Sequence, residues 1–587
     1  MSRKDDSGDQ DRNPAEQLWN IERRRVLQLA GAGVAGLGMT GAGSGVASAA
    51  TDCADGPFER TYEGGTVNFA QIQSEQGAKR GPPDMSTAEP GGRDKSGEPP
   101  YGRARGQQGD EGDGELEIGT EYEGLGSNDT RGGVPSDSQI ATGRSKNVHA
   151  VNQQVAIYNK QSGTKQRQVD LEDIWEPVIP EPEGGFALGY PFVFDPRARY
   201  DRNEDRFVLC ATQFVMGLTA DGEMIGKEEV EEGEVDPKAV SRAPRGYFVV
   251  AVSQSSNPNG TWNVYRLPPE DADGPDVAGL VDYPTLGLDQ DAIYLTQNFF
   301  ANDGSFTVTM VTLDKAEVYA GEPVTAHHFD NMNNPGEDAP FTFTVQPAFQ
   351  PFSGGSSGTY YMVNSGFTSD ALTLWEVTDP TTNPSLSCYT VDVEAYSPPP
   401  TADQPNTDST IDTIGSRLMN ADYNLEDGSL WTAHTVAAEG DDGVVAAIRW
   451  YEIDVESREL VQSGTYGEPD KSYYIPTVKS YEDATIIVHN VSGPDTFARM
   501  DVAGRTADFT PGEIEDSVAI QDGESKYNAL PGPVERWGDY NGASLDPQTK
   551  NFWTVSQYSP NINIPVDEET RDPYATRIAE VFFDDEL

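Results

Sequence analysis

The stretch 284–327 reads PTLGLDQDAIYLTQNFFANDGSFTVTMVTLDKAEVYAGEPVTAH. It contains four short apolar or alternating runs: Pro284–Asp289, Ala292–Thr296, Phe306–Val311 and Val324–His327. Gly, Asn, Asp and Pro lie between the runs, and helical spacing is almost absent. This texture is typical of short β-strands joined by turns. The stretch therefore predicts one sheet of four strands.

The same order of runs recurs along the chain. The preceding unit contains Pro191–Asp195, Arg206–Cys210, Tyr247–Val252 and Trp262–Leu267, and the next contains Gln346–Phe349, Tyr360–Val363, Leu372–Val377 and Cys388–Val391. Further units follow around Leu430–Ala433, Thr485–Val488 and Phe552–Val555 with Arg577–Val581, and a partial unit, Val148–Lys160, precedes them all. We count about seven units at spacings of roughly 45 to 60 residues, which is the signature of a β-propeller. The expected fold is all-β, a β-propeller of about seven four-stranded blades over residues 136–587. A double β-sandwich fits less well, because the same strand order recurs so often.

The two ends of this repeat are incomplete. The unit Val148–Lys160 has too few strands for a blade, and the last unit, near Trp553–Phe583, is one strand short. Propellers commonly close by sharing one blade between both termini, which leaves no sheet edge open. We therefore predict that a strand near Val151–Tyr158, or one just upstream of it, shares a blade with Ala575–Phe583.

The N-terminal segment carries an export signal. Arg23-Arg24-Arg25-Val26-Leu27-Gln28 precedes an apolar Gly/Ala-rich run that contains Ala47-Ser48-Ala49, an A-x-A cleavage signal. Residues 1–49 are thus predicted to be a twin-arginine signal peptide, which exports proteins already folded. We expect an extracellular or cell-surface location, with no membrane span in the mature chain.

The segment 50–135 is rich in Gly, Pro, Ser and charged residues and largely lacks apolar periodicity, so it is predicted to be a mostly disordered linker, in which the short stretch Tyr62–Ile72 either adds a strand or stays unstructured. The chain has three cysteines. Cys210 and Cys388 lie in strand-like runs, and we interpret both as buried thiols rather than a disulfide. Cys53 follows the cleavage site, but Thr51-Asp52 before it do not fit a lipidation signal.

The charge balance is strongly acidic: Lys and Arg number 41 and Asp and Glu 97, a net charge of -56. The acids are spread along the whole chain, which favours adaptation to a salt-rich cytosol, as in a halophilic archaeon, over an acidic tail or a Ca²⁺-binding array. Such a surface repels nucleic acid and anionic membranes. The expected partner is a glycan or a cell-surface protein, and the expected state is a monomer.

Polar segments open the inner strands of several units, at one end of the predicted channel. The candidate ligand-binding residues come from Val281–Pro284 and Arg536–Gly542, and they are Asp282, Tyr283, Arg536, Asp539, Tyr540 and Asn541. In the alternative interpretation, these side chains bond the next blade and hold the ring together. The five histidines lack zincin spacing and no Cys-x-x-Cys exists, so we expect no metal site and no cofactor.

Three segments together resemble a known group of proteins: the turn Ser255–Trp262, the segment Asp282–Gly287 and the segment Arg536–Pro547. From His149 to Phe583 the chain is similar to secreted, sialidase-like (Asp-box-type) bacterial and archaeal β-propellers, mostly without assigned activity. The resemblance implies a propeller fold and an extracellular setting. The turn lacks the Asp of an Asp-box, and we find no sialidase-like arginine triad or Arg-Ile-Pro motif. No catalytic residue is therefore carried over.

Two functions from different classes follow. In the first, the protein is an exported, salt-adapted propeller that binds a carbohydrate or cell-surface partner without turning it over. In the second, it is an extracellular glycoside hydrolase or lyase that uses carboxylates at the channel mouth, with Asp282 and Asp539 as candidates. The sequence leaves open whether the protein is an enzyme.

Overall fold

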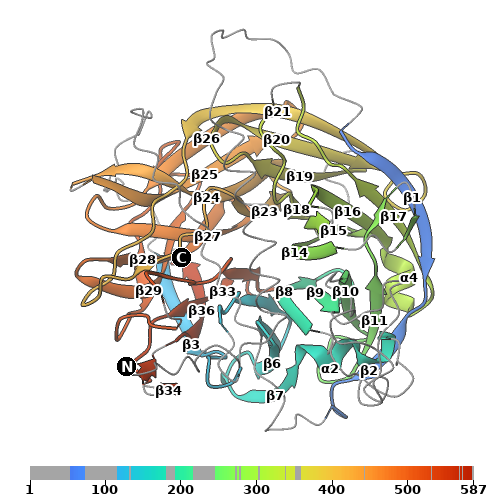
Figure 1. Ribbon diagram of the computed structural model, residues 1–587, viewed down its shortest axis with the longest axis horizontal. Coiled ribbons are helices and arrows are strands. Elements are labelled where there is room, and N and C mark those ends of the chain that lie inside the picture. The colour runs from blue at the N-terminus through green and yellow to red at the C-terminus, as the bar shows by residue number, and fades with distance from the viewer. Residues whose placement is uncertain are drawn as a thin grey trace, which may run out of the picture.

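The computed structural model describes residues 53–72, 116–130, 134–179, 192–215, 245–350 and 358–584, with short gaps inside the last two ranges. Its strands form a ring of radially arranged sheets (Figure 1). The predicted signal peptide lies outside the described residues, as does most of the segment between 72 and 116. Among the described residues, no helix is long and apolar enough to cross a membrane.

The described strands make seven four-stranded blades, each an antiparallel meander from the channel outward. Blade 1 comprises β4 (Gln139–Thr142), β5 (Lys146–Val151), β6 (Gln154–Asn159) and β7 (Lys165–Asp170). Blade 2 comprises β8 (Phe192–Asp201), β9 (Arg206–Val215), β10 (Arg245–Ser253) and β11 (Thr261–Leu267). Blade 3 comprises β14 (Gly279–Leu288), β15 (Ala292–Ala301), β16 (Phe306–Asp314) and β17 (Val324–Asp330). Blade 4 comprises β18 (Gln346–Phe349), β19 (Thr359–Ser365), β20 (Ser369–Thr378) and β21 (Ser385–Tyr396).

The remaining three blades follow the same plan. Blade 5 comprises β23 (Leu418–Asn424), β24 (Ser429–Gly440), β25 (Gly443–Asp454) and β26 (Glu459–Tyr466). Blade 6 comprises β27 (Ser472–Tyr481), β28 (Ala484–Gly493), β29 (Thr496–Arg505) and β30 (Val518–Gln521). Blade 7 comprises β32 (Gly542–Leu545), β33 (Phe552–Tyr558), β36 (Ala575–Phe583) and β3 (Leu116–Glu123). The prediction of about seven four-stranded blades is confirmed.

Short elements lie between and beside the blades. They are the helices α2 (Leu171–Trp175), η1 (Glu176–Val178) and α4 (Lys315–Ala320), and the strand pairs β12 (Glu270–Asp271) with β13 (Gly274–Pro275), β22 (Thr410–Ile411) with β31 (Val534–Glu535), and β34 (Ile564–Val566) with β35 (Glu569–Arg571).

Inner strands bury both faces because each blade packs on its neighbours. All ten residues of β14 are buried, which explains why this strand has a nearly continuous apolar sequence. Large indole rings fill the space between sheets: Trp262, Trp375, Trp450 and Trp553 are each almost fully buried. The inner strands β14, β18 and β23 also pair in parallel, β14 with β18 at Leu288 and Phe349, and β18 with β23 at Ala348–Phe349 and Ala421–Asp422.

The ring is closed by a strand from the segment ahead of blade 1 and by the last described strand of the chain. Strand β3 pairs antiparallel with the C-terminal strand β36, from Leu116 opposite Phe583 to Glu123 opposite Arg577 (Figure 1). The predicted sharing of one blade is confirmed, but the closing strand lies further upstream than Val151–Tyr158. Blade 1 is complete without a partner, so the expectation of a partial first unit was wrong. The sequence did not reveal its strands β4 and β7, because Gln139 in β4 and Lys165–Gln168 in β7 are polar and interrupt the apolar runs that indicate strands.

The predicted boundary at residue 136 was also wrong, because three strands from the segment 50–135 belong to the propeller. Besides β3, the strand β1 (Asp55–Tyr62) pairs with β17 at the outer edge of blade 3, and β2 (Gly65–Asn68) pairs with β11 of blade 2. These strands cover outer edges that would otherwise expose unpaired backbone groups. Outer strands bury little side-chain surface, so these strands contain few apolar residues and are hard to detect in the sequence.

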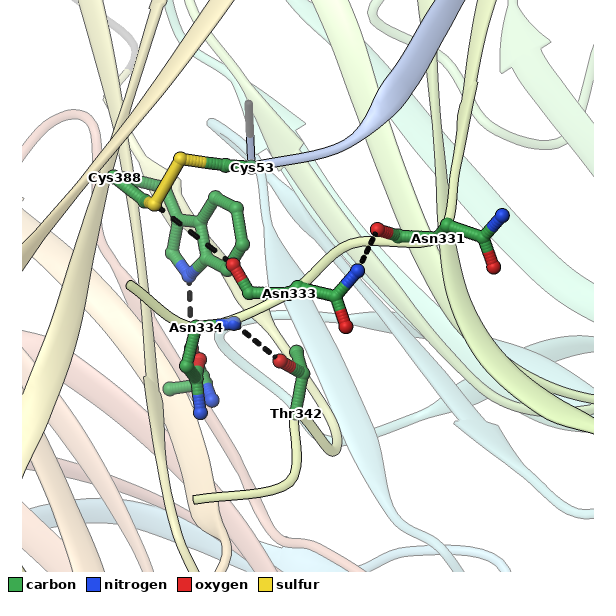
Figure 2. The surroundings of a disulfide bond; sticks show 8 residues. Cys53, Asn331, Asn333, Asn334, Thr342 and Cys388 are labelled. Carbon is green, nitrogen blue, oxygen red and sulfur yellow. Dashed lines mark hydrogen bonds between the residues drawn. A yellow bond between two sulfur atoms is a disulfide. The ribbon is translucent and has the colours of Figure 1, made fainter. Parts of the chain in front are cut away.

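A disulfide anchors this N-terminal arm. Cys53 bonds Cys388 of β21, with an S–S distance of 2.04 Å across 335 residues of sequence (Figure 2). The interpretation of Cys388 as a buried thiol was therefore wrong. Cys210 is a buried free thiol, as predicted. The spacing of the cysteines in the sequence does not indicate this bond, because the two cysteines are separated by more than half of the chain.

Three of the few lysines are buried in ion pairs that join blades. Lys479 contacts Asp422 at 2.5 Å, Lys160 contacts Asp546 at 2.7 Å and Lys315 contacts Asp201 at 3.0 Å, with every side chain at most 8% exposed. These positive charges are thus placed between blades, where they cannot offset the acidic outer surface.

We expect folding to require salt. At molar KCl the Debye length is about 3 Å, and at 0.01 M it is about 30 Å, so dilution restores the mutual repulsion of 97 acidic side chains. The melting temperature should fall by roughly 10 °C or more on transfer from molar to 0.01 M KCl. Circular dichroism at fixed pH measures it, and an unchanged melting temperature would show that the acidic surface does not affect stability.

Candidate functional site

A strained bulge marks the start of several inner strands. Asp195 in β8, Tyr283 in β14 and Ile475 in β27 each have a positive φ, of 53°, 52° and 53°, and each precedes a proline. The strand register shifts at each of these places. A non-glycine residue is costly there, and such bulges re-aim side chains. They place polar groups of several blades at one end of the channel.

Tyr283 joins three blades. Its ring is fully buried, its backbone N–H donates to Asp195 Oδ2 of blade 2 at 3.2 Å, and its hydroxyl donates to the Asp539 carbonyl ahead of blade 7 at 3.2 Å. The neighbouring Asp282 is only 3% exposed. Both residues therefore lie inside the packed ring.

Tyr540 mirrors Tyr283. The two rings meet edge to face with centroids 5.6 Å apart, and the Tyr540 hydroxyl donates to the Pro196 carbonyl at 2.9 Å. The guanidinium carbon of Arg197 lies 3.3 Å from the Tyr540 centroid and 4.9 Å from that of Tyr283, and its Nε donates to the Pro284 carbonyl at 2.8 Å. Arg197 thus makes buried cation–π contacts with both tyrosines.

The charged residues form a second network beside the tyrosines. Arg536 makes a direct ion pair with Asp539 and lies 3.7 Å from Asp412. The backbone N–H of Asp539 donates to Asp137 Oδ1 at 2.7 Å, and Asn152 donates to Asp137 Oδ2 at 2.5 Å. All these side chains are buried, so the network joins the segment before β4 to the segment before β32.

Asn541 bridges three blades. Its amide donates to the Ile475 carbonyl at 2.7 Å and to Asn490 Oδ1 at 3.0 Å, and it accepts a bond from Ser556 Oγ at 2.7 Å. Its backbone carbonyl accepts bonds from Gln139 and Thr477. Every polar atom of this side chain is used inside the ring.

The six predicted residues thus lie at one end of the ring, with Tyr283, Tyr540, Arg536 and Asp539 linked through the contacts above. Tyr283, Asp539, Tyr540 and Asn541 bond segments of other blades, as in the alternative interpretation of the sequence. Arg536 pairs with Asp539 and lies near Asp412, and Asp282 is buried. The sequence reasoning missed Asp137, Asp195, Asn152, Asp412 and Arg197. The sequence did hold one indication of Asp195: the pair Asp195-Pro196 occupies the same place in blade 2 as the pair Tyr283-Pro284 in blade 3.

The carboxyl of Asp137 has a pKa well above that of an ordinary aspartate. The pKa of its carboxyl is raised to about 7, first by burial and then by the nearby Asp539 carboxylate, although Arg536 and the two hydrogen bonds lower it. The folded pKa is above the ordinary value near 3.9, so folding favours the protonated form. Stability from this group is complete at low pH and is lost as pH rises through about 7.

The variant Asp137→Asn should remove this dependence. Between pH 4 and 8 in molar KCl, the unfolding free energy of the wild type should fall by roughly 1–3 kcal/mol more than that of the variant. Denaturant unfolding at each pH measures both proteins, and any loss from the altered hydrogen bonds appears as a constant offset. Parallel pH curves for the two proteins would contradict the assignment.

The channel itself is narrow. A cavity of about 20 Å³ lies between side chains of six blades, among them Arg197, Arg199, Asp422, Lys479 and Asn541. That space is enough for about one water molecule. Of the candidate residues, Asn541 contributes to the lining of this cavity.

No family model matches this chain, and no curated protein matches it. Solved structures match at low similarity. One is titled as the β-propeller domain of the Trilobed protease from Pyrococcus furiosus, with 8% identity, a TM-score of 0.25 and coverage of 52% of this chain and 68% of that one. Another, "NanB plus Optactamide", has 10% identity, a TM-score of 0.34 and coverage of 79% and 70%. The RRP9 WD40 repeats have 9% identity, a TM-score of 0.33 and coverage of 80% and 100%. The neighbours are β-propellers, and the fold assignment of this chain rests on its own strand pairing.

Proposed function

We propose that this protein is an exported, salt-adapted propeller that binds a carbohydrate or cell-surface partner without turning it over. The burial of both predicted catalytic carboxylates supports this. Asp282 is 3% exposed and Asp539 is 2% exposed, and Asp539 is engaged by Arg536. A glycosidase needs two carboxyl groups that reach the scissile bond from opposite sides. These two are buried in the packed ring.

One observation favours the second candidate, a glycoside hydrolase or lyase. Asp137 and Asp539 are neighbouring carboxyls, and the raised pKa of Asp137, about 7, is the range of a general acid at neutral pH. That chemistry requires the end of the channel to open so that a sugar reaches the pair. The two candidates therefore differ in whether product forms.

A glycan array and a polysaccharide hydrolysis screen, both run with the mature protein in molar KCl, separate the candidates. Retention of a glycan or of cell-surface material without new reducing ends is the expected result. Product formation that Asp539→Asn abolishes would establish the hydrolase or lyase instead. Binding to neither glycans nor cell envelopes would refute the proposed function.

Export by the twin-arginine route is part of the proposal. The guanidinium pair Arg23-Arg24 is the feature that the translocase reads, and lysine does not reproduce its planar geometry. Replacing both with Lys should trap the precursor in the cytosol, measured by immunoblots of cell and medium fractions. The single variant Arg25→Lys is the control and should be secreted like the wild type. Undiminished secretion of the double variant would contradict the twin-arginine route.

A further inference from the structure

The small cavity in the channel is lined by an excess of positive charge. Its walls are inner strands of six blades, with Asn541 just before β32, and all of these residues are described. The charged side chains among them are three cations and one carboxylate: Arg197, Arg199, Lys479 and Asp422. Acids outnumber bases 97 to 41 in the whole chain, so the charge of this cavity is opposite in sign to that of the protein.

The carboxylate of the cavity is already engaged. Asp422 Oδ1 accepts a bond from Lys479 Nζ at 2.5 Å, and its Oδ2 accepts one from the backbone N–H of Ser480 at 2.7 Å. Asp422 is 1% exposed and Lys479 is 6% exposed, so this ion pair is buried. The charge of Asp422 therefore balances that of Lys479, and the two arginines carry the surplus.

The two arginines contact neutral groups. Arg199 Nη1 donates to Gln139 Oε1 at 2.9 Å and to the Ala198 carbonyl at 3.0 Å. Arg197 bonds a backbone carbonyl and contacts two tyrosine rings, as described above. Among the described residues, neither guanidinium forms an ion pair with a carboxylate. A charge taken out of water without an ionic partner is strongly unfavourable, so buried charges normally pair or bind an ion.

The pKa shifts of the cavity agree with its charge balance. The pKa of Arg199 is lowered to about 10, first by burial and then by Arg197, although Asp422 raises it. The pKa of Lys479 is lowered by burial, and Arg202 and Arg199 lower it as well, against the opposite effect of Asp422. Both directions mean that the positive charge of the cavity is only partly compensated. A negative ion beside Arg199 would complete the compensation.

The cavity admits only a small ion. Its volume of about 20 Å³ exceeds the roughly 10–15 Å³ that one water molecule needs, and a halide ion is only slightly larger than water. A sugar ring needs several times this space. Two neutral donors of the lining are occupied, because Thr477 Oγ1 donates to the Asn541 carbonyl and Asn420 Nδ2 donates to the Val478 carbonyl. The cations are therefore the groups that would hold a small anion here.

From the size and the charge of this cavity we infer that it binds one monovalent anion of halide size, which is chloride in molar KCl. The anion contacts the guanidinium of Arg199 and balances the surplus charge of the two arginines. Because the walls come from six of the seven blades, the bound ion also links inner strands across the channel and stabilises the ring. This site goes beyond the proposed function, since its ligand is an inorganic ion and not a glycan or a cell-surface partner.

The test is the melting temperature of the mature protein at constant molar potassium, as chloride replaces glutamate. Glutamate screens the acidic surface equally but is too large for the cavity. The wild type should gain on the order of 3 °C, in a saturable way, once chloride reaches about 100 times its dissociation constant. Arg199→Gln should abolish this gain. Arg144→Gln removes the same charge from an exposed arginine that pairs with Asp205 outside the cavity, and this matched control should keep the gain. Each protein is compared with itself in glutamate, so lost hydrogen bonds cancel.

Crystals of the wild type grown in KBr give a second measurement that does not depend on a variant. An anomalous bromide peak in the cavity, beside the Arg199 guanidinium, is the expected result. An equal gain in melting temperature for the wild type and Arg199→Gln, or a water molecule alone in the cavity, would overturn the anion site. Either of these results leaves the proposed function standing, whereas a failure to bind glycans or cell envelopes refutes that function and leaves the anion site unaffected.

Discussion

Deleting residues 575–587 is expected to abolish folding of the propeller. The deletion removes β36, which lies between β33 and β3 in blade 7 and pairs with both. The buried side chains Ile578 and Val581 each contribute about 1.5–3 kcal/mol, and β3 loses its only sheet partner among the described strands. Domains are stable by about 5–15 kcal/mol in total, so this loss, with the opening of the ring, exceeds what the fold can absorb.

Limited proteolysis and circular dichroism in molar KCl measure the effect. The control is a deletion of residues 81–100, which keeps β1, β2, β3 and the disulfide. A control deletion that removed the whole of 71–133 would also take β3 and would no longer be neutral. Cooperative unfolding of the 575–587 deletion near the wild-type melting temperature would mean that the seven-bladed ring does not depend on its closing blade.

The second large effect is expected from the double variant Cys53→Ser/Cys388→Ser. The bond spans 335 residues, and a loop of that length restricts the unfolded chain by roughly 5 kcal/mol in the chain-entropy description. Measured losses for native disulfides are about 2–5 kcal/mol, and the variant should fall in the upper part of that range. Guanidinium unfolding in molar KCl, with and without a reducing agent, measures the change.

The matched control for the disulfide is Cys210→Ala, which removes the buried free thiol and leaves the bond intact. It should change stability far less than the double variant and should keep the sensitivity to reducing agents. The double variant should also expose the N-terminal arm, because β1 then holds to β17 through backbone pairing and a few side-chain contacts, without a covalent bond. If the double variant and the wild type are equally stable in the absence of a reducing agent, the disulfide does not stabilise the fold.

Much of the fold was predictable because a propeller blade is local in sequence. The runs Ala292–Thr296 and Phe306–Val311 became β15 and β16, each paired with the strand next to it in the chain. Adjacent strands joined by short turns leave their pattern in the sequence. Outer strands are different, because they bury one face or less. Lys165–Asp170 and Asp55–Tyr62 were missed for that reason.

The candidate site was predictable in place but not in role. Tyr283 lies at the bulge within β14 and Tyr540 lies just before β32, and the repeat indicates that both face one end of the ring. Whether such polar side chains reach a ligand or a neighbouring blade depends on distances of a few ångströms between segments hundreds of residues apart. Arg197, which contacts both tyrosines, has no sequence feature that marks it as their partner.

The sequence by itself determined the strands, their grouping into about seven sheets and the acidic character of the surface, because each depends on residues close together in the chain or on composition. The tertiary structure alone decided the pairing of β3 with β36, the bond from Cys53 to Cys388 and the contact of Arg197 with Tyr540. Contacts across such separations arise only when the blades close into a ring, since chain entropy opposes them until the intervening structure has formed.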